Sequence, residues 1–283
     1  MTVDTFSALM KEPNIPLREY LRPGKRSIVF KTIGFWVCFS LLFIGLQHMQ
    51  LPGLGGAAAP VAAGIVIVAM LLLIVRLLKT DGESLRDIGL CFTSKTPLQF
   101  VVGLSLGVAV VAIMIGVLLV LTPLEIRASA NSDVLSVLGA SLLVLFVLAL
   151  MEEIVFRSYP LFKLRQAWGI RPAVYITSVA FAFYHGFAFE NLLGPGVWGL
   201  FYGWMALSTN SIALPTGFHL GLNWLQALLG MKPRYSGSIW ELSIGPGSGF
   251  VDVETLGLLM QVILLVVGVF IVEKLVTNRS RTA

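Results

Sequence analysis

Two adjacent glutamates and an arginine interrupt an apolar segment of the chain. The segment "LGASLLVLFVLALMEEIVFR" ends with Glu152, Glu153 and Arg157. Because an ionised side chain inside a bilayer costs a few kcal/mol, each of these groups needs a partner or a function. On a helix, side chains four residues apart share a face, whereas neighbours are rotated by about 100°. We therefore expect Glu153 to pair with Arg157, which leaves Glu152 available as a general base.

Two of the three histidines also lie in apolar segments. His185 is in "FAFYHGFAF", and His219 is in "TGFHLGLNWLQ", four residues before Asn223, whereas His48 ends the first apolar segment and suits the membrane interface. Imidazole can act as a base, and an imidazole N–H with an amide NH₂ can donate to an oxyanion. Glu152, His185 and His219 should lie roughly 12 to 21 Å from the cytoplasmic ends of their helices. We expect them in one layer of the membrane.

Three ordered motifs connect these residues: EExxxR at Glu152, Glu153 and Arg157, FxxxH at Phe181 and His185, and HxxxN at His219 and Asn223. These three motifs, in this order and in successive apolar segments, resemble the motifs of the CPBP intramembrane proteases. That family includes the type II CAAX prenyl endopeptidases and the bacterial Abi or bacteriocin-processing proteins. The resemblance covers about residues 145–230 and says nothing about the N-terminal arm or the loop at 230–255.

The resemblance implies a metal-independent glutamic endopeptidase that hydrolyses peptide bonds inside a membrane cavity. It assigns water activation to Glu152 and His185 and stabilisation of the oxyanion to His219 and Asn223. Supporting roles fall to Glu153, Arg157 and Phe181. We expect the cavity to open toward the cytoplasmic half of the bilayer, and the substrate to be a membrane-associated peptide or protein. No cofactor is expected, and the alternative is a zinc ion held by Glu152, His185 and His219, although HExxH is absent.

Non-catalytic explanations remain open for the same residues. Glu153 and Arg157 can form a purely structural ion pair, and polar side chains such as His185 and His219 can bridge membrane helices. A non-catalytic scaffold or a bacteriocin-immunity-type protein would use the same fold. A proton-coupled transporter would also use glutamate, arginine and histidine, but the polar groups cluster in the second half of the chain only.

The elements that must position these residues are membrane-spanning helices. Of the 283 residues, 57% are hydrophobic and 12% are charged, about half the charge of a soluble domain. Apolar segments of roughly 20 residues suffice to cross a bilayer as helices. They predict an all-α polytopic bundle of about eight helices around a central intramembrane active-site cavity. The predicted spans are 28–47, 60–78, 98–121, 135–157, 172–187, 192–208, 211–229 and 256–275.

The fifth to seventh spans are short and interrupted by glycine and proline, so neighbouring helices should enclose them. The membrane domain is expected at 28–275, with the catalytic core at about 135–230. A polar N-terminal arm at 1–27 and a short tail at 276–283 flank it. We interpret the first apolar segment as a retained helix rather than a cleaved signal peptide. The glycine-rich "GPGSG" indicates a flexible loop.

The basic residues predict the topology. Of the 20 Lys and Arg residues, 17 fall on one predicted side of the membrane, and only Arg127, Lys232 and Arg234 fall on the other. The positive-inside rule makes the richer side cytoplasmic, with both termini there. We expect a multi-pass protein of the cell (inner) membrane whose partners are the lipid bilayer and its substrate. The net charge of +5 then reflects topology and not a nucleic acid. Cys38 and Cys91 suggest no disulfide or metal site.

Overall fold

The computed structural model describes residues 23–49, 54–129, 133–232, 237–247 and 249–281. Most of the predicted arm, residues 1–22, and the last two residues of the predicted tail lie outside these ranges. The described chain is a bundle of helices. Its eight main helices are α3 (Lys25–His48), α4 (Ala58–Asp81), α5 (Thr96–Leu121), α6 (Val134–Arg157), α8 (Ile170–Tyr184), α10 (Pro195–Thr209), α11 (Ala213–Leu228) and α12 (Val253–Arg281). They correspond in order to the eight predicted spans, so the prediction of an all-α polytopic bundle is confirmed.

Five of the helical segments are long and apolar enough to cross a membrane. These are Lys25–His48, Gly55–Asp81, Thr96–Leu121, Val134–Trp168 and Val253–Asn278. Large apolar side chains point away from the bundle on all five: Leu41, Leu72, Ile113, Leu143 and Phe270 expose between 64% and 69% of their surface. Such a surface matches a hydrocarbon environment, in which the backbone hydrogen bonds must be satisfied within the helices. The protein is therefore a multi-pass membrane protein.

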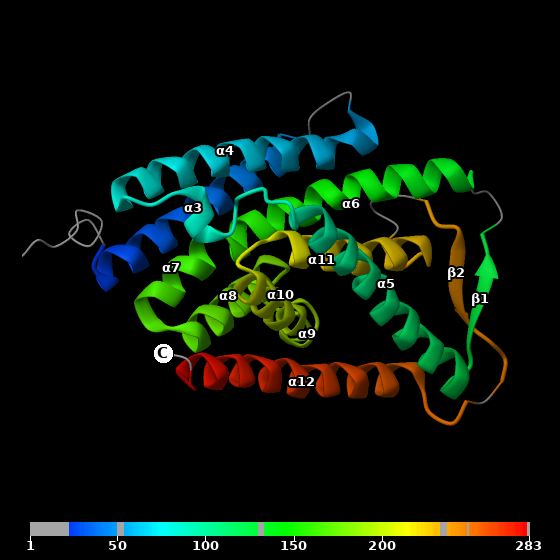
Figure 1. Cartoon of the computed structure of the whole chain (residues 1–283). Helices are drawn as coiled ribbons and strands as arrows, with labels where there is room; N and C mark the ends of the chain where they lie inside the picture. Colours follow the sequence, from blue (N-terminus) through cyan, green and yellow to red (C-terminus); the bar gives the residue numbers. More distant parts are fainter. Residues whose placement is uncertain (1–22, 50–53, 130–132, 233–236, 248, 282–283) are drawn as a thin grey trace, which may run out of the picture.

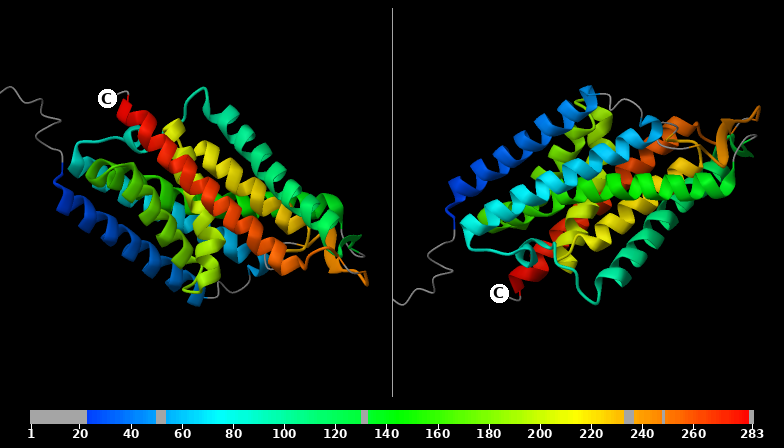
Figure 2. Two further views of the ribbon diagram at one scale, coloured as in Figure 1. Left: turned by 90° about the horizontal axis from the view of Figure 1, so that it is seen from below. Right: turned by 90° about the horizontal axis from the view of Figure 1, so that it is seen from above.

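The shorter helices α10 and α11 lie inside the bundle, as their glycine and proline residues predict, whereas α8 exposes Val179 and Phe183 and is only partly enclosed. Most residues of α10 and α11 are buried. Figures 1 and 2 show α4 and α12 on opposite faces of the molecule, with α10 between them. His219 and Asn223 are therefore carried by an enclosed helix, whereas α6, which carries Glu152 and Glu153, also presents apolar side chains such as Leu143 to the outside.

Closely packed glycines fix α11 against α5. Gly103 and Gly107 of α5 lie against Gly217 and Gly221 of α11. A Cβ atom on Gly217 would overlap the carbonyl oxygen of Phe100, and one on Gly107 would overlap that of Phe218. The two backbones are in direct contact, as in small-xxx-small pairs of membrane helices. This contact sets the position of the helix that carries His219 and Asn223.

An additional helix, α7 (Tyr159–Trp168), closes one end of the bundle. It was not predicted. The backbone leaves the helical region at Ser158, with φ −96° and ψ −108°, so α7 runs in a new direction after α6. Pro160 lies in its first turn, and Gly169, with a φ of +89°, ends it. Glu152 is thus only five residues, or about 7.5 Å, from the end of its own helix α6, which is closer than the expected 12 to 21 Å.

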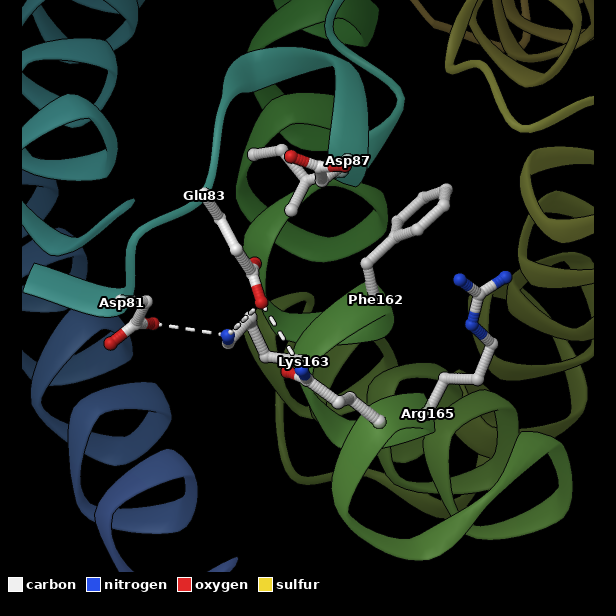
Figure 3. A pocket seen from close by; sticks show the side chains of 8 residues that line it. Asp81, Glu83, Asp87, Phe162, Lys163 and Arg165 are labelled. Atoms are coloured by element: carbon white, nitrogen blue, oxygen red, sulfur yellow. Dashed lines mark hydrogen bonds and ion pairs between the residues drawn. The ribbon is translucent and has the colours of Figure 1, made fainter. Parts of the chain in front are cut away.

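Buried ion pairs hold α7 in place (Figure 3). Lys163, only 1% exposed, lies 3.0 Å from Asp81 Oδ2 and 3.1 Å from Glu83 Oε1. Gln166 also donates to Glu83 Oε1, at 3.1 Å, and Lys31 of α3 pairs with Asp81. The network ties α7 to the ends of α3 and α4.

A small antiparallel sheet lies at the opposite end of the bundle (Figure 1). Strand β1 (Leu124–Ala128) pairs with β2 (Trp240–Ile244), and Leu124 is opposite Ile244. Part of the segment at 230–255, expected as a loop, is therefore a strand. The alternating sequences "LEIRA" and "WELSI" have the two-residue period of a strand. The remaining short elements are α9 (Phe189–Leu193), η1 (Gly55–Ala57) and η2 (Leu85–Ile88).

Candidate active site

Three helices bring two carboxylates and two imidazoles together. Glu152 and Glu153 are in the last two turns of α6, His185 follows α8, and His219 is on α11. Glu152 Oε2 lies 3.5 Å from His219 Nε2 and 4.0 Å from His185 Nε2. Glu152, His185 and His219, expected in one layer of the membrane, are thus neighbours.

The orientation of His185 follows from a backbone contact. Its Nδ1 lies 2.9 Å from the carbonyl oxygen of Phe181. A carbonyl oxygen can only accept, so Nδ1 carries the hydrogen and donates it. In the neutral imidazole, Nε2 then carries a lone pair, and it is the atom nearest to Glu152.

His219 lies between the two glutamates. Its Nδ1 is 3.0 Å from Glu153 Oε1, while its Nε2 is turned toward Glu152 Oε2. An ionised carboxylate only accepts hydrogen bonds, so His219 Nδ1–H donates to Glu153. The ring of Tyr202 from α10 stacks on the imidazole, with 4.7 Å between centroids and 17° between planes. His219, 4% exposed, is therefore held at one edge and on one face.

The predicted ion pair of Glu153 and Arg157 is present, but Arg157 is not the only partner of Glu153 among the described residues. Arg157 Nε lies 3.8 Å from Glu153 Oε2, and both side chains are fully buried. Glu153 is thus shared between Arg157 and His219. The guanidinium forms no hydrogen bond with any described residue. It lies over the rings of Phe181 and Tyr202, 4.2 and 5.0 Å from their centroids, so cation–π contacts stabilise it.

Phe181 is at the centre of these contacts. Its ring lies edge-on to both imidazoles, with 4.7 Å to the centroid of His185 and 5.9 Å to that of His219. It also packs beneath Arg157 and is only 2% exposed. The side chain therefore separates the guanidinium from the histidines and fixes the spacing between them.

A cavity of about 240 Å³ adjoins the two histidines. Its lining includes His185, His219, Asn223, Trp198, Tyr202 and Lys232. The half-buried Asn223 is thus placed beside His219 at the cavity wall. Tyr202 and Lys232 were not among the predicted site residues, because neither belongs to a motif or has a helical spacing to one.

The cavity extends away from α7. Pro195 begins α10, Gln226 is near the end of α11, and Lys232 follows that helix, and all three line the cavity. If the basic residues set the orientation, these positions are in the outer half of the bilayer. The expected opening toward the cytoplasmic half does not agree with this placement. The physical reason is that α7, with the buried Lys163, covers the other end.

No group of three or more His, Cys, Asp or Glu side chains is arranged to hold a metal ion within the described ranges. Glu152, His185 and His219 lie near one another, but a zinc site built from them requires a rearrangement of these side chains. The zinc alternative therefore calls for direct metal analysis.

Comparison with known proteins identifies a match in the segment that carries these residues. Residues 134–225 match the family described as Type II CAAX prenyl endopeptidase Rce1-like. The match covers about a third of the chain, begins with α6 and ends within α11. It contains all seven predicted site residues. No curated protein and no solved structure matches the chain.

Proposed function

This chain is a member of the CPBP/CAAX protease family, and we propose that it is an intramembrane endopeptidase that works through a water activated by glutamate. The family supports a CAAX-type intramembrane endopeptidase in general. The proposed substrates are membrane-associated peptides or proteins, because membrane helices enclose the cavity beside the candidate residues.

The observation that carries the proposal is the position of Glu152 Oε2. This oxygen is buried, faces the Nε2 atoms of both histidines, and has no hydrogen-bond partner among the described residues. Glu152 Oε2 and His185 Nε2 are 4.0 Å apart, so a small outward shift of the two side chains would admit a water within hydrogen-bond distance of both atoms. Both Glu152 and His185 Nε2 can accept a hydrogen bond from that water, so they can orient it and remove its proton.

In the proposed reaction, Glu152 takes part in two proton transfers. Glu152 accepts a proton from the water as the water oxygen forms a bond to the scissile carbonyl carbon. The carbonyl oxygen becomes an oxyanion that accepts hydrogen bonds from His219 Nε2–H and the Asn223 amide. Glu152 then returns the proton to the leaving nitrogen, and the carbon–nitrogen bond breaks. The products are a new carboxylic acid and a new amine, and the acid then gives its proton to the amine, which leaves a carboxylate and an ammonium group.

Glu153 and Arg157 are proposed as positioning residues. Both nitrogens of a doubly protonated imidazole carry a hydrogen, so in that form His219 can donate Nδ1–H to Glu153 and Nε2–H to the oxyanion at the same time. Arg157 balances the charge of Glu153 inside the bundle. Phe181 keeps the two imidazoles and the guanidinium at fixed separations.

Membrane proteomics of cells that carry the wild type or Glu152→Gln tests the function. We expect at least one membrane protein or peptide to accumulate uncut in the variant, with the cleaved product absent. His48→Gln is the matched control, because His48 is at the end of α3 and is exposed. Identical membrane proteomes for wild type and Glu152→Gln would instead favour the non-catalytic scaffold.

Metal analysis of the purified protein separates the glutamic mechanism from the zinc alternative. The proposal expects no zinc in stoichiometric amount and full activity after dialysis against a chelator. Stoichiometric zinc that is lost together with activity, and restored with it, would contradict the metal-independent mechanism.

A further inference from the structure

A polar cavity lies at the start of α5, outside the candidate active site. It has a volume of about 310 Å³, and its lining combines the segment that leads from η2 into α5 with the turn between α10 and α11. The two segments are held together by the main chain, because Ile212 N–H donates to the carbonyl oxygen of Gly89 at 3.2 Å. The polar cavity and the catalytic cavity have no lining residue in common. The motif residues therefore give the polar cavity no role.

The polar cavity carries positive charge. Arg86 and Lys95 line it and are exposed, and no Asp or Glu is among its described lining residues. Neither cation forms an ion pair with another described residue. The first turn of α5, "TPLQ", contains no acidic side chain, and the N-terminus of a helix favours negative charge. An anionic group therefore suits this cavity.

Gln99 presents an unused hydrogen-bond acceptor in the same cavity. Its Oε1 is buried and accepts no hydrogen bond from any described residue. A buried amide oxygen without a partner costs free energy, and a donor on a bound ligand would remove that cost. The ligand that fits best therefore has both a negative charge and a hydrogen-bond donor such as a hydroxyl group.

An apolar cavity adjoins the polar one. Its volume is about 470 Å³, and Cys91 and Ser211 line both cavities. The walls come from the start of α5, from α6 and from the start of α11, and they include Leu90, Phe100, Phe146, Leu150 and Ile212. Each volume is in the range of about 300–1,000 Å³ that is typical of ligand sites. The two cavities together therefore suit a ligand with a polar, anionic end and an apolar end.

We propose that the two cavities bind one anionic phospholipid of the cytoplasmic leaflet. The phosphate pairs with Arg86 and Lys95, a headgroup hydroxyl such as that of phosphatidylglycerol donates to Gln99 Oε1, and an acyl chain occupies the apolar cavity. The positive-inside rule places the start of α5 on the cytoplasmic side, where basic pockets between helices suit acidic headgroups. A free phosphate compound would leave the apolar cavity unused, so the contact between the two cavities favours the intact lipid.

Native mass spectrometry of the purified full-length protein tests the site. Dioleoyl phosphatidylglycerol and dioleoyl phosphatidylcholine are titrated separately, because they share their acyl chains and differ in headgroup charge. We expect one phosphatidylglycerol to bind with a Kd about tenfold or more below that of phosphatidylcholine, and Arg86→Gln/Lys95→Gln to abolish the difference. Arg76→Gln/Lys79→Gln is the matched control and should keep it, because this variant removes two exposed charges that line neither cavity.

Two results would overturn the phospholipid site. Equal affinities of the wild type for the two lipids, or the same loss in both double variants, would leave only a general attraction between basic loops and lipid. Displacement of phosphatidylglycerol by an equal concentration of glycerol 3-phosphate would make a free phosphate compound the ligand. The measurement uses no substrate, so its outcome is independent of peptide cleavage.

Single substitutions test the two ends of the lipid separately. Leu90→Trp fills the apolar cavity and should weaken phosphatidylglycerol binding about tenfold, whereas Leu98→Trp, at a position on α5 that is 66% exposed, should not. Gln99→Leu should weaken phosphatidylglycerol severalfold and leave phosphatidylcholine unchanged, because the phosphatidylcholine headgroup has no donor. The unfolding midpoint of each variant without lipid checks that it is folded. Unchanged phosphatidylglycerol binding by folded Leu90→Trp and Gln99→Leu would overturn the proposed placement.

Discussion

The carboxylate of Glu153 contacts two side chains, His219 and Arg157, and only Arg157 belongs to the same sequence motif. Its Oε1 accepts from His219 Nδ1 at 3.0 Å, and its Oε2 faces Arg157 Nε at 3.8 Å. The EExxxR spacing predicts the second contact but not the first, because His219 is 66 residues away along the chain. The glutamate therefore has a structural and a proposed positioning role, and the two can be separated by mutation.

Replacing Glu153 should reduce both stability and activity. Glu153→Gln leaves Arg157 buried without a counter-ion, and breaking a buried pair costs about 3–5 kcal/mol. In Glu153→Gln/Arg157→Met the unpaired charge is gone, so we expect the thermal unfolding midpoint to recover while peptide cleavage stays at the low level of the single variant. Recovery of cleavage together with stability would contradict the positioning role and leave only a structural pair.

The residue types and spacings were enough to predict that Glu153 pairs with Arg157 and that Glu152, His185 and His219 lie together, because side chains four residues apart share a helical face. They were not enough for Tyr202 or Lys232. Tyr202 contacts His219 through stacking between α10 and α11, and such a contact has no spacing rule in the sequence. Lys232 was assigned to the outer side of the membrane from its position after the seventh predicted span, and only the fold shows that it reaches the cavity.

Among the elements, α5 and α11 depend most directly on small residues. The sequences "GLSLG" at 103–107 and "GFHLG" at 217–221 are both small-xxx-small patterns. Their pairing was predictable in principle from these letters, and it explains why His219 stands between two glycines. The break at Ser158 does have a local signal, because a serine followed two residues later by Pro160 in "FRSYPLF" suits the start of a new helix, and the predicted spans did not use it.

Substitution in the glycine contact should disturb the site from a distance. In Gly221→Ala the added Cβ would overlap the carbonyl oxygen of Leu104, so the helices must separate. Overpacking of this kind costs about 1–3 kcal/mol, and we expect a lower unfolding midpoint and weaker cleavage, because His219 and Asn223 move with α11.

Gly116→Ala is the matched control for this experiment. Gly116 is also on α5, and nothing lies within 4 Å of its added Cβ. Because alanine is the better helix former, this change should be neutral or stabilise by up to about 1 kcal/mol. Equal effects of the two substitutions on unfolding would show that the α5–α11 contact does not carry the stability assigned to it.

For the whole molecule, hydropathy predicted the order of the eight main helices, because each apolar segment must satisfy its own backbone hydrogen bonds, and five of the helical segments are long and apolar enough to cross a membrane. It also predicted that the short helices are enclosed, since glycine and proline suit protein-lined surroundings, and this holds for α10 and α11 but only in part for α8. It did not predict which end of the bundle is open. That depends on α7, whose Lys163 is buried through partners in α4 and the loop after it, and no local pattern in the sequence indicates such partners.

The topology decides on which side of the membrane the cavity opens. In a Cys38→Ser/Cys91→Ser background, Ser94→Cys and Gly247→Cys each place one thiol at an exposed position on opposite sides of the predicted membrane. The positive-inside rule predicts that an impermeant maleimide labels Gly247→Cys in intact cells and labels Ser94→Cys only after permeabilisation. The reverse pattern would invert the assignment and place the cavity opening on the cytoplasmic side.

The most direct test of the central claim is the rate at which purified Glu152→Gln cleaves a peptide that the wild type cleaves. Because Gln cannot accept the proton of the attacking water, we expect the rate to fall by about 10²-fold or more, with an unchanged unfolding midpoint and unchanged peptide binding. Cleavage by well-folded Glu152→Gln at the wild-type rate would contradict the proposal that Glu152 activates the water.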